Sequence, residues 1–299
     1  MGYTDAFGSY HPTVNFLYFS LIFVFSMICM HPVFLMISLL SAVWYYITLR
    51  GAKAAGLILR GILPLFLITA FVNPAFSHAG QTRLCYLPTG NPLTLESIVY
   101  GCAAGMMLAA VLLWFACFSE VFTSDKFVYL FGRIIPAMSL VLSMTLRFVP
   151  RFKAQFDQVR QVQATLGRDT ANGPLLKRIK NAVACFSIVV TWSMENALET
   201  ADSMKSRGYG TARRTAYSIY RFTERDKTAL CFLLFCGLFL LCGGISGSLY
   251  WRYFPSIRGV LIQPITIVLA TVYFVFCSMP IYIDRKEVAL WKKSLQSKA

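Results

Sequence analysis

The chain has 299 residues and a formal net charge of +15; 57% of its residues are apolar and only 14% are charged. Soluble globular domains carry about 25% charged residues, so this composition excludes an ordinary water-soluble domain and a disordered chain. An apolar and basic chain is typical of a protein that crosses the membrane several times. Nucleic-acid binding is disfavoured, because the basic residues lie between long apolar runs.

Six apolar runs are long enough, or nearly so, to cross a bilayer, which takes about 20 residues. They are approximately residues 14–30, 32–49, 54–71, 95–118, 228–249 and 259–281. A further run, 127–146, is interrupted by Gly132 and Pro136. We expect it to lie at the membrane surface or against other helices, because another crossing would place the basic segment behind it outside the cell. An all-α membrane protein with about six transmembrane helices is therefore predicted, and about seven with the N-terminus outside is the alternative.

The basic residues predict which segments face the cytoplasm. Residues 147–227 hold 15 of the 28 basic residues against seven acidic ones, and the tail 284–299 is also basic. The positive-inside rule places both segments and both termini in the cytoplasm, and the loop 72–94 with Cys85 outside. Within that loop, the run from Leu84 to Leu93 predicts a small hairpin. Four regions are therefore predicted. They are N-terminal transmembrane helices with an interfacial helix near 127–146 (residues 1–146), a cytoplasmic helical region (147–227), a C-terminal transmembrane helix pair (228–283) and a basic cytoplasmic tail (284–299).

Two long amphipathic helices are predicted within residues 147–227. In the first, apolar residues recur every three or four positions and mark one helix face. They are Phe148, Phe152, Phe156, Val159, Val162 and Leu166. The second helix runs from about Leu175 to Ser206 and is apolar nearly all round over residues 182–194. That stretch is roughly 20 Å long, too short to span a bilayer, so we expect protein or membrane to shield it.

Each of these helices is followed by a glycine that suits the left-handed conformation at a helix C-terminus. Arg207 precedes Gly208 and would project from the second helix end, where a guanidinium offers a rigid fork of donors to a carboxylate on a partner. At the first end Leu166 precedes Gly167, and Arg168 follows.

Three motifs carry a family resemblance: Arg147-Phe148-Val149-Pro150-Arg151-Phe152, the segment 161–167, and the segment 201–209. With them the chain resembles the transmembrane T component of energy-coupling factor transporters, the family that includes the cobalt transport protein CbiQ. The resemblance implies two cytoplasmic coupling helices whose Ala-Arg-Gly-like tips dock on two ATP-binding-cassette ATPases. It also implies that the T component joins these ATPases to a substrate-binding membrane protein, the S component. ATP-driven closure of the ATPases would then move the coupling helices.

Carried onto this sequence, the resemblance assigns two docking tips. The second tip is Ser206-Arg207-Gly208, and the first is Thr165-Leu166-Gly167, which lacks the arginine unless Arg168 replaces it. Supporting residues in the coupling helices are Arg147, Pro150, Glu195, Glu199 and Asp202. The three acidic side chains share one helix face, which we expect either to be solvated or to pair with basic residues such as Arg147 or Arg151.

The resemblance implies a non-catalytic subunit in a prokaryotic cell membrane, serving uptake of a vitamin or a transition metal such as cobalt. The sequence has no G-x-x-x-x-G-K-[ST] loop, so ATP hydrolysis is left to the partners, and no cofactor or nucleic-acid partner is expected. His11, His31 and His78 have no acidic or cysteine neighbour at ligand spacing, so no metal site is expected. The alternative function is a self-contained permease, which would place polar residues deep in several spans.

Overall fold

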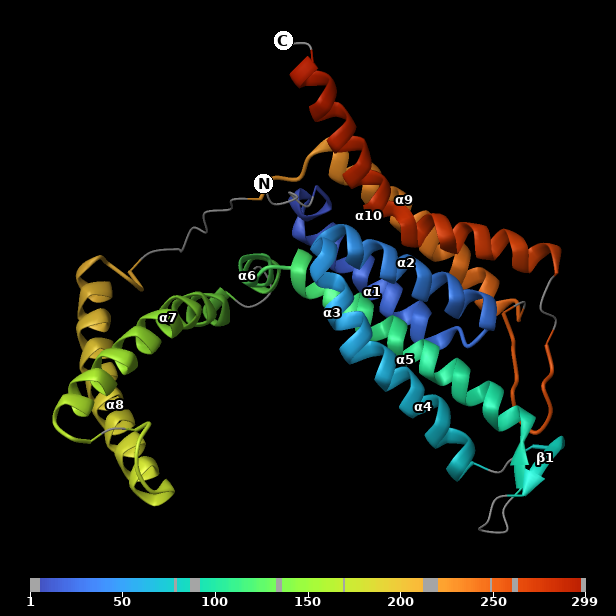
Figure 1. The fold of residues 1–299 in the computed structure, drawn as a ribbon. Helices are drawn as coiled ribbons and strands as arrows, with labels where there is room; N and C mark the ends of the chain where they lie inside the picture. The colour runs from blue at the N-terminus through green and yellow to red at the C-terminus, as the bar shows by residue number, and fades with distance from the viewer. Residues whose placement is uncertain are drawn as a thin grey trace. The chain divides into compact units, whose positions relative to one another are not determined.

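The computed structural model describes residues 6–77, 80–86, 92–132, 136–168, 170–211, 220–247, 249–259 and 263–296. The chain divides into two compact units, residues 1–123 with 220–299, and residues 124–219 (Figure 1). The described residues of both units are mainly helical, and the named strands form one two-stranded sheet in the first unit. The all-α prediction is confirmed at this level.

The first unit is a helix bundle. Its helices are α1 (Pro12–Ile28), α2 (Pro32–Arg50), α3 (Ala54–Leu57), α4 (Leu63–Phe76), α5 (Leu95–Val121), α9 (Glu224–Ile245) and α10 (Pro264–Gln296). Short helical segments are η1 (Phe7–Ser9), η2 (Gly51–Lys53) and the π-helical η3 (Ile58–Ile62). Helices α1 and α2 form the middle of the bundle, because both contact α5 while α1 contacts α9 and α2 contacts α10 (Figure 1).

Four helical stretches of the described residues are long and apolar enough to cross a membrane: Pro32–Phe76, Leu95–Val121, Glu224–Ile245 and Pro264–Leu290. Helix α1 is a shorter apolar helix of 17 residues. The six predicted runs become four stretches for two reasons: α1 is counted with the shorter helices, and helical structure continues from α2 through η2, α3 and η3 into α4, which merges runs 32–49 and 54–71.

The last predicted span is displaced in the structure. The run 259–281 was expected to be one helix, but α10 starts at Pro264 and continues to Gln296. Pro264 suits the first turn of a helix, which explains the later start. The charged residues after 284 are mostly good helix formers, so the helix continues beyond the predicted end at residue 281.

One end of the bundle brings the first described residues together with charged side chains of α9 and α10. The N–H of Phe7 donates to Asp284 Oδ1 and that of His11 to Asp226 Oδ1, each at 3.0 Å. The guanidinium of Arg285 lies 4.9 Å from the ring centroid of Trp44. An ion pair between Arg50 and Glu120 joins the ends of α2 and α5. We call this the charged end of the bundle.

The opposite end carries the predicted hairpin, which is confirmed. Strand β1 (Arg83–Tyr86) pairs antiparallel with β2 (Pro92–Thr94), and the turn 87–91 lies outside the described residues. Glu96, at the start of α5, accepts a hydrogen bond from the Thr82 hydroxyl at 2.6 Å. Ser97 donates to the carbonyl of Ser77 (2.6 Å), which brings the end of α4 to the start of α5.

The second unit consists of α6 (Ser124–Gly132), α7 (Pro136–Thr165) and α8 (Leu175–Ser206). Helix α8 has the predicted bounds. Helix α7 starts well before Phe148, because residues 136–147 begin with a proline that suits a first turn and continue with good helix formers. The run 127–146 is thus divided between α6 and α7, and α7 passes residue 146 without interruption.

Candidate functional site: two helix tips

Helix α8 ends in a hydrogen-bonded turn that exposes Arg207. The N–H of Gly208 donates to the carbonyl of Lys205 (2.9 Å), and that of Tyr209 donates to the carbonyl of Met204 (3.1 Å). This pair of bonds is a Schellman motif, which favours glycine in the left-handed conformation. Gly208 has a φ of +78°, as the sequence predicted. Arg207 directly precedes it, and its side chain is exposed.

Helix α7 ends in the same motif. The N–H of Gly167 donates to the carbonyl of Ala164 (3.0 Å), and that of Arg168 donates to the carbonyl of Gln163 (2.9 Å). The φ of Gly167 is +75°. Leu166 directly precedes this glycine, and 67% of its surface is exposed. The two tips are therefore alike in backbone and differ in side chains.

The hydrogen bonds define which residues of the two tips are equivalent. The pairs are Thr165 and Ser206, Leu166 and Arg207, Gly167 and Gly208, and Arg168 and Tyr209. The hydroxyls of Thr165 and Ser206 donate to the carbonyls three residues earlier, at 2.7 and 2.9 Å, which extends the equivalence by one position. Arg168 lies beyond its glycine, in the place of Tyr209, and does not occupy the place of Arg207.

Helices α7 and α8 are held together by aromatic contacts. The rings of Phe152 and Trp192 meet edge to face at 6.0 Å between centroids, and the guanidinium of Arg151 lies 5.4 Å from the Trp192 ring. Phe148 stacks on Phe152 one turn earlier at 5.7 Å. The cation and rings connect the middle of α7 to the middle of α8, so the two helices reinforce one another.

The predicted apolar face of α7 is confirmed over most of its length. Phe148, Phe152, Phe156 and Val159 are half-buried. Near the tip the pattern changes: Val162 is 60% exposed, whereas Gln163 is half-buried. An α-helix has 3.6 residues per turn, so a face defined by steps of three and four residues drifts around the helix. The side that contacts α8 has therefore shifted from Val162 to Gln163 near the tip.

Helix α8 has an inner and an outer apolar face. The inner face buries Asn181, Cys185 and Val189, which are spaced four residues apart. The outer face is apolar yet exposed, and includes Leu176, Ile179, Val183, Phe186 and Met194. The chain itself thus shields residues 182–194 on the inner side, and the outer face is exposed in the part of the chain that the structure describes.

The supporting residues predicted in these helices are dispersed. Glu195, Glu199 and Asp202 are exposed, and within the part of the chain that the structure describes none forms an ion pair. Arg147 lies over the ring of Phe148, with its guanidinium carbon 5.5 Å from the ring centroid. Pro150 lies inside α7 and cannot donate a helical hydrogen bond.

Among the described residues, no group of three or more His, Cys, Asp or Glu side chains could hold a metal ion, and His78 lies outside them. The described cysteines are free thiols. The two tips present exposed backbone turns, with Arg207 before the glycine of one and Leu166 before the glycine of the other.

The comparison with known proteins agrees with the family resemblance that the tip motifs carry. The family model of the cobalt transport protein CbiQ matches residues 12–217, about two thirds of the 299 residues. The energy-coupling factor transporter transmembrane protein EcfT of Lactobacillus helveticus is 33% identical over 36% of this chain, and the match spans only 39% of that relative.

Two EcfT relatives match over longer stretches. The protein of Acidaminococcus fermentans is 30% identical over 66% of this chain and 78% of its own length. That of Staphylococcus aureus is 23% identical over 80% of this chain and 97% of its own length. The residues that the family model matches, 12–217, contain α7, α8 and both tips. This chain belongs to the family of transmembrane T components of energy-coupling factor transporters that includes CbiQ.

Proposed function

We propose that this chain is the energy-coupling scaffold of an importer, in which it transmits ATP-driven motion of two cytoplasmic ATPases to a membrane-embedded, substrate-binding S component. The single observation that carries the proposal is that α7 and α8 end in the same exposed turn. Two equivalent tips suit two ATPases of similar shape. The chain itself is non-catalytic in this proposal, and ATP hydrolysis belongs to the partner ATPases.

The proposed topology has about six crossings, formed by α1, α2, α3 with α4, α5, α9 and α10. The 45-residue stretch Pro32–Phe76 would be roughly 68 Å long as one helix, more than twice a bilayer's hydrocarbon core. Gly51, with a φ of +58°, interrupts its direction after α2. The contacts at the charged end and at the hairpin end support this division, because each of these segments runs from one end to the other.

The proposed orientation places the charged end in the cytoplasm. The chain leaves the bundle after Glu120 and returns before Asp226, so both connections to the tip-bearing unit lie at this end. The positive-inside rule gives the same orientation from the 15 basic residues of 147–227. Both chain termini are then cytoplasmic, and the hairpin lies outside.

The outer apolar face of α8 is proposed to rest on the S component or the bilayer. A row of exposed apolar side chains this long would otherwise promote aggregation in the cytosol. The cargo, a vitamin or a transition metal such as cobalt, is proposed to bind in the S component.

The decisive experiment is ATPase co-purification and uptake for Arg207→Ala. Removing a charge from a desolvated contact costs about 2–5 kcal/mol, enough to weaken docking more than tenfold. Arg160→Ala is the matched control, because Arg160 is an exposed arginine on α7 outside the tip. We expect loss of transport in Arg207→Ala alone, with unchanged membrane expression. Normal ATPase binding and uptake in that variant would refute the proposed docking, and uptake by the chain without partners would favour a permease.

A further inference from the structure

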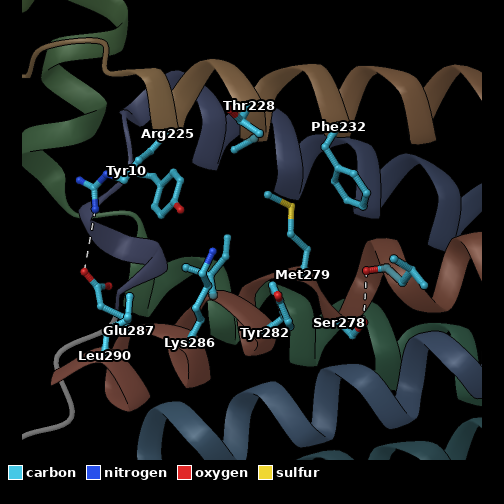
Figure 2. Close-up of a pocket in the computed structure, with 13 residues that line it drawn as sticks. Tyr10, Arg225, Thr228, Phe232, Ser278, Met279, Tyr282, Lys286, Glu287 and Leu290 are labelled. Carbon is cyan, nitrogen blue, oxygen red and sulfur yellow. Dashed lines mark hydrogen bonds and ion pairs between the residues drawn. The ribbon is translucent and has the colours of Figure 1, made fainter. Parts of the chain in front are cut away.

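A groove runs between the start of α9 and residues 275–290 of α10, toward the charged end of the bundle (Figure 2). Its volume is about 600 Å³, within the range of small-ligand sites. Tyr10 closes it from the segment that precedes α1. All of its walls belong to the first unit.

The groove changes from apolar to charged along its length. Phe232 and Met279 line one part, and Arg225, Lys286 and Glu287 lie at the other (Figure 2). On α9, the seven residues from Arg225 to Phe232 correspond to roughly 10 Å of helix. Both walls are helices long and apolar enough to cross a membrane. An apolar part of this kind suits lipid acyl chains, and a charged part suits lipid head groups.

The charged mouth has an excess of cations. Arg225 Nη1 is 3.9 Å from Glu287 Oε1, and both side chains are about half exposed, so this ion pair is weak. The guanidinium of Arg225 also lies 5.6 Å from the centroid of the Tyr10 ring. Within the described part of the chain, Lys286 forms no ion pair. Arg225 therefore keeps donors for another anion, and Lys286 adds a second cation.

Tyr10 adds a neutral donor at the same mouth. Burial raises the pKa of Tyr10 above its ordinary value, while the nearby Arg225 charge acts in the opposite direction. Its hydroxyl thus stays protonated at neutral pH. A guanidinium, an ammonium and a phenol together match the oxygen atoms of a phosphodiester.

We propose that this groove binds an anionic glycerophospholipid, with the phosphate and acidic head group at Arg225 and Lys286 and an acyl chain along Phe232, Val275 and Met279. Basic pockets between transmembrane helices on the cytoplasmic side are suited to such head groups. Within this proposal, only the assignment of the groove to the cytoplasmic leaflet rests on the proposed function. The lipid would bridge α9 and α10, the two helices that follow the tip-bearing unit in the chain.

The test uses the purified full chain in detergent, exchanged with an equimolar mixture of phosphatidylglycerol and phosphatidylcholine, and counts retained lipids by native mass spectrometry. We expect selective retention of phosphatidylglycerol. The double variant Arg225→Gln with Lys286→Gln should lose about 30-fold in affinity for phosphatidylglycerol. Each cation near a membrane surface strengthens the binding of an anionic lipid about fivefold, and the variant removes two. Lys227→Gln with Lys293→Gln is the charge-matched control, because it removes two cations from the same two helices and neither residue lines the groove.

A second variant fills the groove without changing charge. Val275→Trp places a bulky ring in the acyl-chain part, and Val268→Trp is the control on the same helix, with 49% exposure against 50%. We expect Val275→Trp alone to reduce retention of phosphatidylglycerol. Equal retention of both lipids by the parent chain, or equal loss in variants and controls, would overturn the proposal. ATPase co-purification is measured in parallel, so failure of the lipid site is distinguishable from failure of tip docking.

Discussion

The residue before the glycine is the main chemical difference between the two helix tips. Arg207 presents a planar cation with several donors, whereas Leu166 presents an exposed aliphatic side chain on the same backbone turn. Because the turns are equivalent, the difference between the tips is chemical and not conformational. An arginine fork suits a carboxylate on a partner, and a leucine suits an apolar recess.

The place of Arg168 leads to a specific expectation. Arg168 is equivalent to Tyr209 and not to Arg207, so we expect Arg168→Ala to reduce ATPase co-purification much less than Arg207→Ala. Leu166→Ala should cost about 1–3 kcal/mol of docking free energy through lost apolar burial. Titrating detergent-solubilised complexes with purified ATPases measures all three variants. A loss in Arg168→Ala as large as that in Arg207→Ala would mean that Arg168 serves as the missing arginine despite its place in the turn.

At the scale of elements, the tips were the most predictable part of the molecule. A glycine after a 3.6-residue apolar pattern is a local signal, so the ends of α7 and α8 follow from short stretches of sequence. The start of α7 was not predicted, because the apolar residues before Phe148 are spread around the helix and show no one-sided 3.6-residue pattern. The packing of α4 on α5 was also missed, although Gly101 and Gly105 have the spacing of a close helix contact.

Gly105 tests this close contact. A Cβ built on Gly105 would lie 3.0 Å from the ring of Phe66 and 3.1 Å from its carbonyl oxygen. We expect Gly105→Val to separate α4 from α5 and to destabilise the bundle by about 1–3 kcal/mol, the usual cost of overpacking. Thermal unfolding in detergent, followed by the accessibility of buried cysteines, measures the effect. Gly56→Val is the control, because no atom outside its own helix backbone lies within 4 Å of a Cβ there.

The two faces of α8 can be separated with one kind of substitution. Val189 is 7% exposed on the inner face, and Val183 is 61% exposed on the outer face. We expect Val189→Lys to disrupt the contact between α7 and α8, since a buried ammonium without a partner is costly. Val183→Lys should leave that contact intact and weaken association with the S component. Limited proteolysis reports the first effect and co-purification the second. If both variants behaved alike in both assays, the division into two faces would be wrong.

At the scale of the whole molecule, the sequence predicts the membrane class and the orientation but not how residues 7–11 contact α9 and α10. Composition and charge clustering are sums over long segments, and they survive errors of several residues in helix bounds. The groove between α9 and α10 could not be predicted from the sequence, because it brings Tyr10 close to Arg225 and Glu287, which lie more than 200 residues away in the chain. No local pattern encodes such a juxtaposition, and the same is true of the bond from Phe7 to Asp284.

Cys85 provides the test of orientation. It belongs to strand β1 at the hairpin end, opposite the charged end, so the proposed topology places it outside. In a chain that keeps Cys85 alone among its nine cysteines, an impermeant thiol reagent applied to intact cells should label it. Several of the other cysteines are buried and small, so replacing them with alanine removes little packing volume.

The matching cytoplasmic control is Arg160→Cys in a chain without other cysteines. Arg160 is exposed on α7, so its replacement should react only after the membrane is permeabilised. Labelling of Cys85 from outside together with protection of position 160 requires an odd number of crossings between them, which α5 alone supplies. Labelling of both from outside would require a second crossing within residues 124–159, and would replace the six-crossing proposal with one that has α6 and α7 in the membrane.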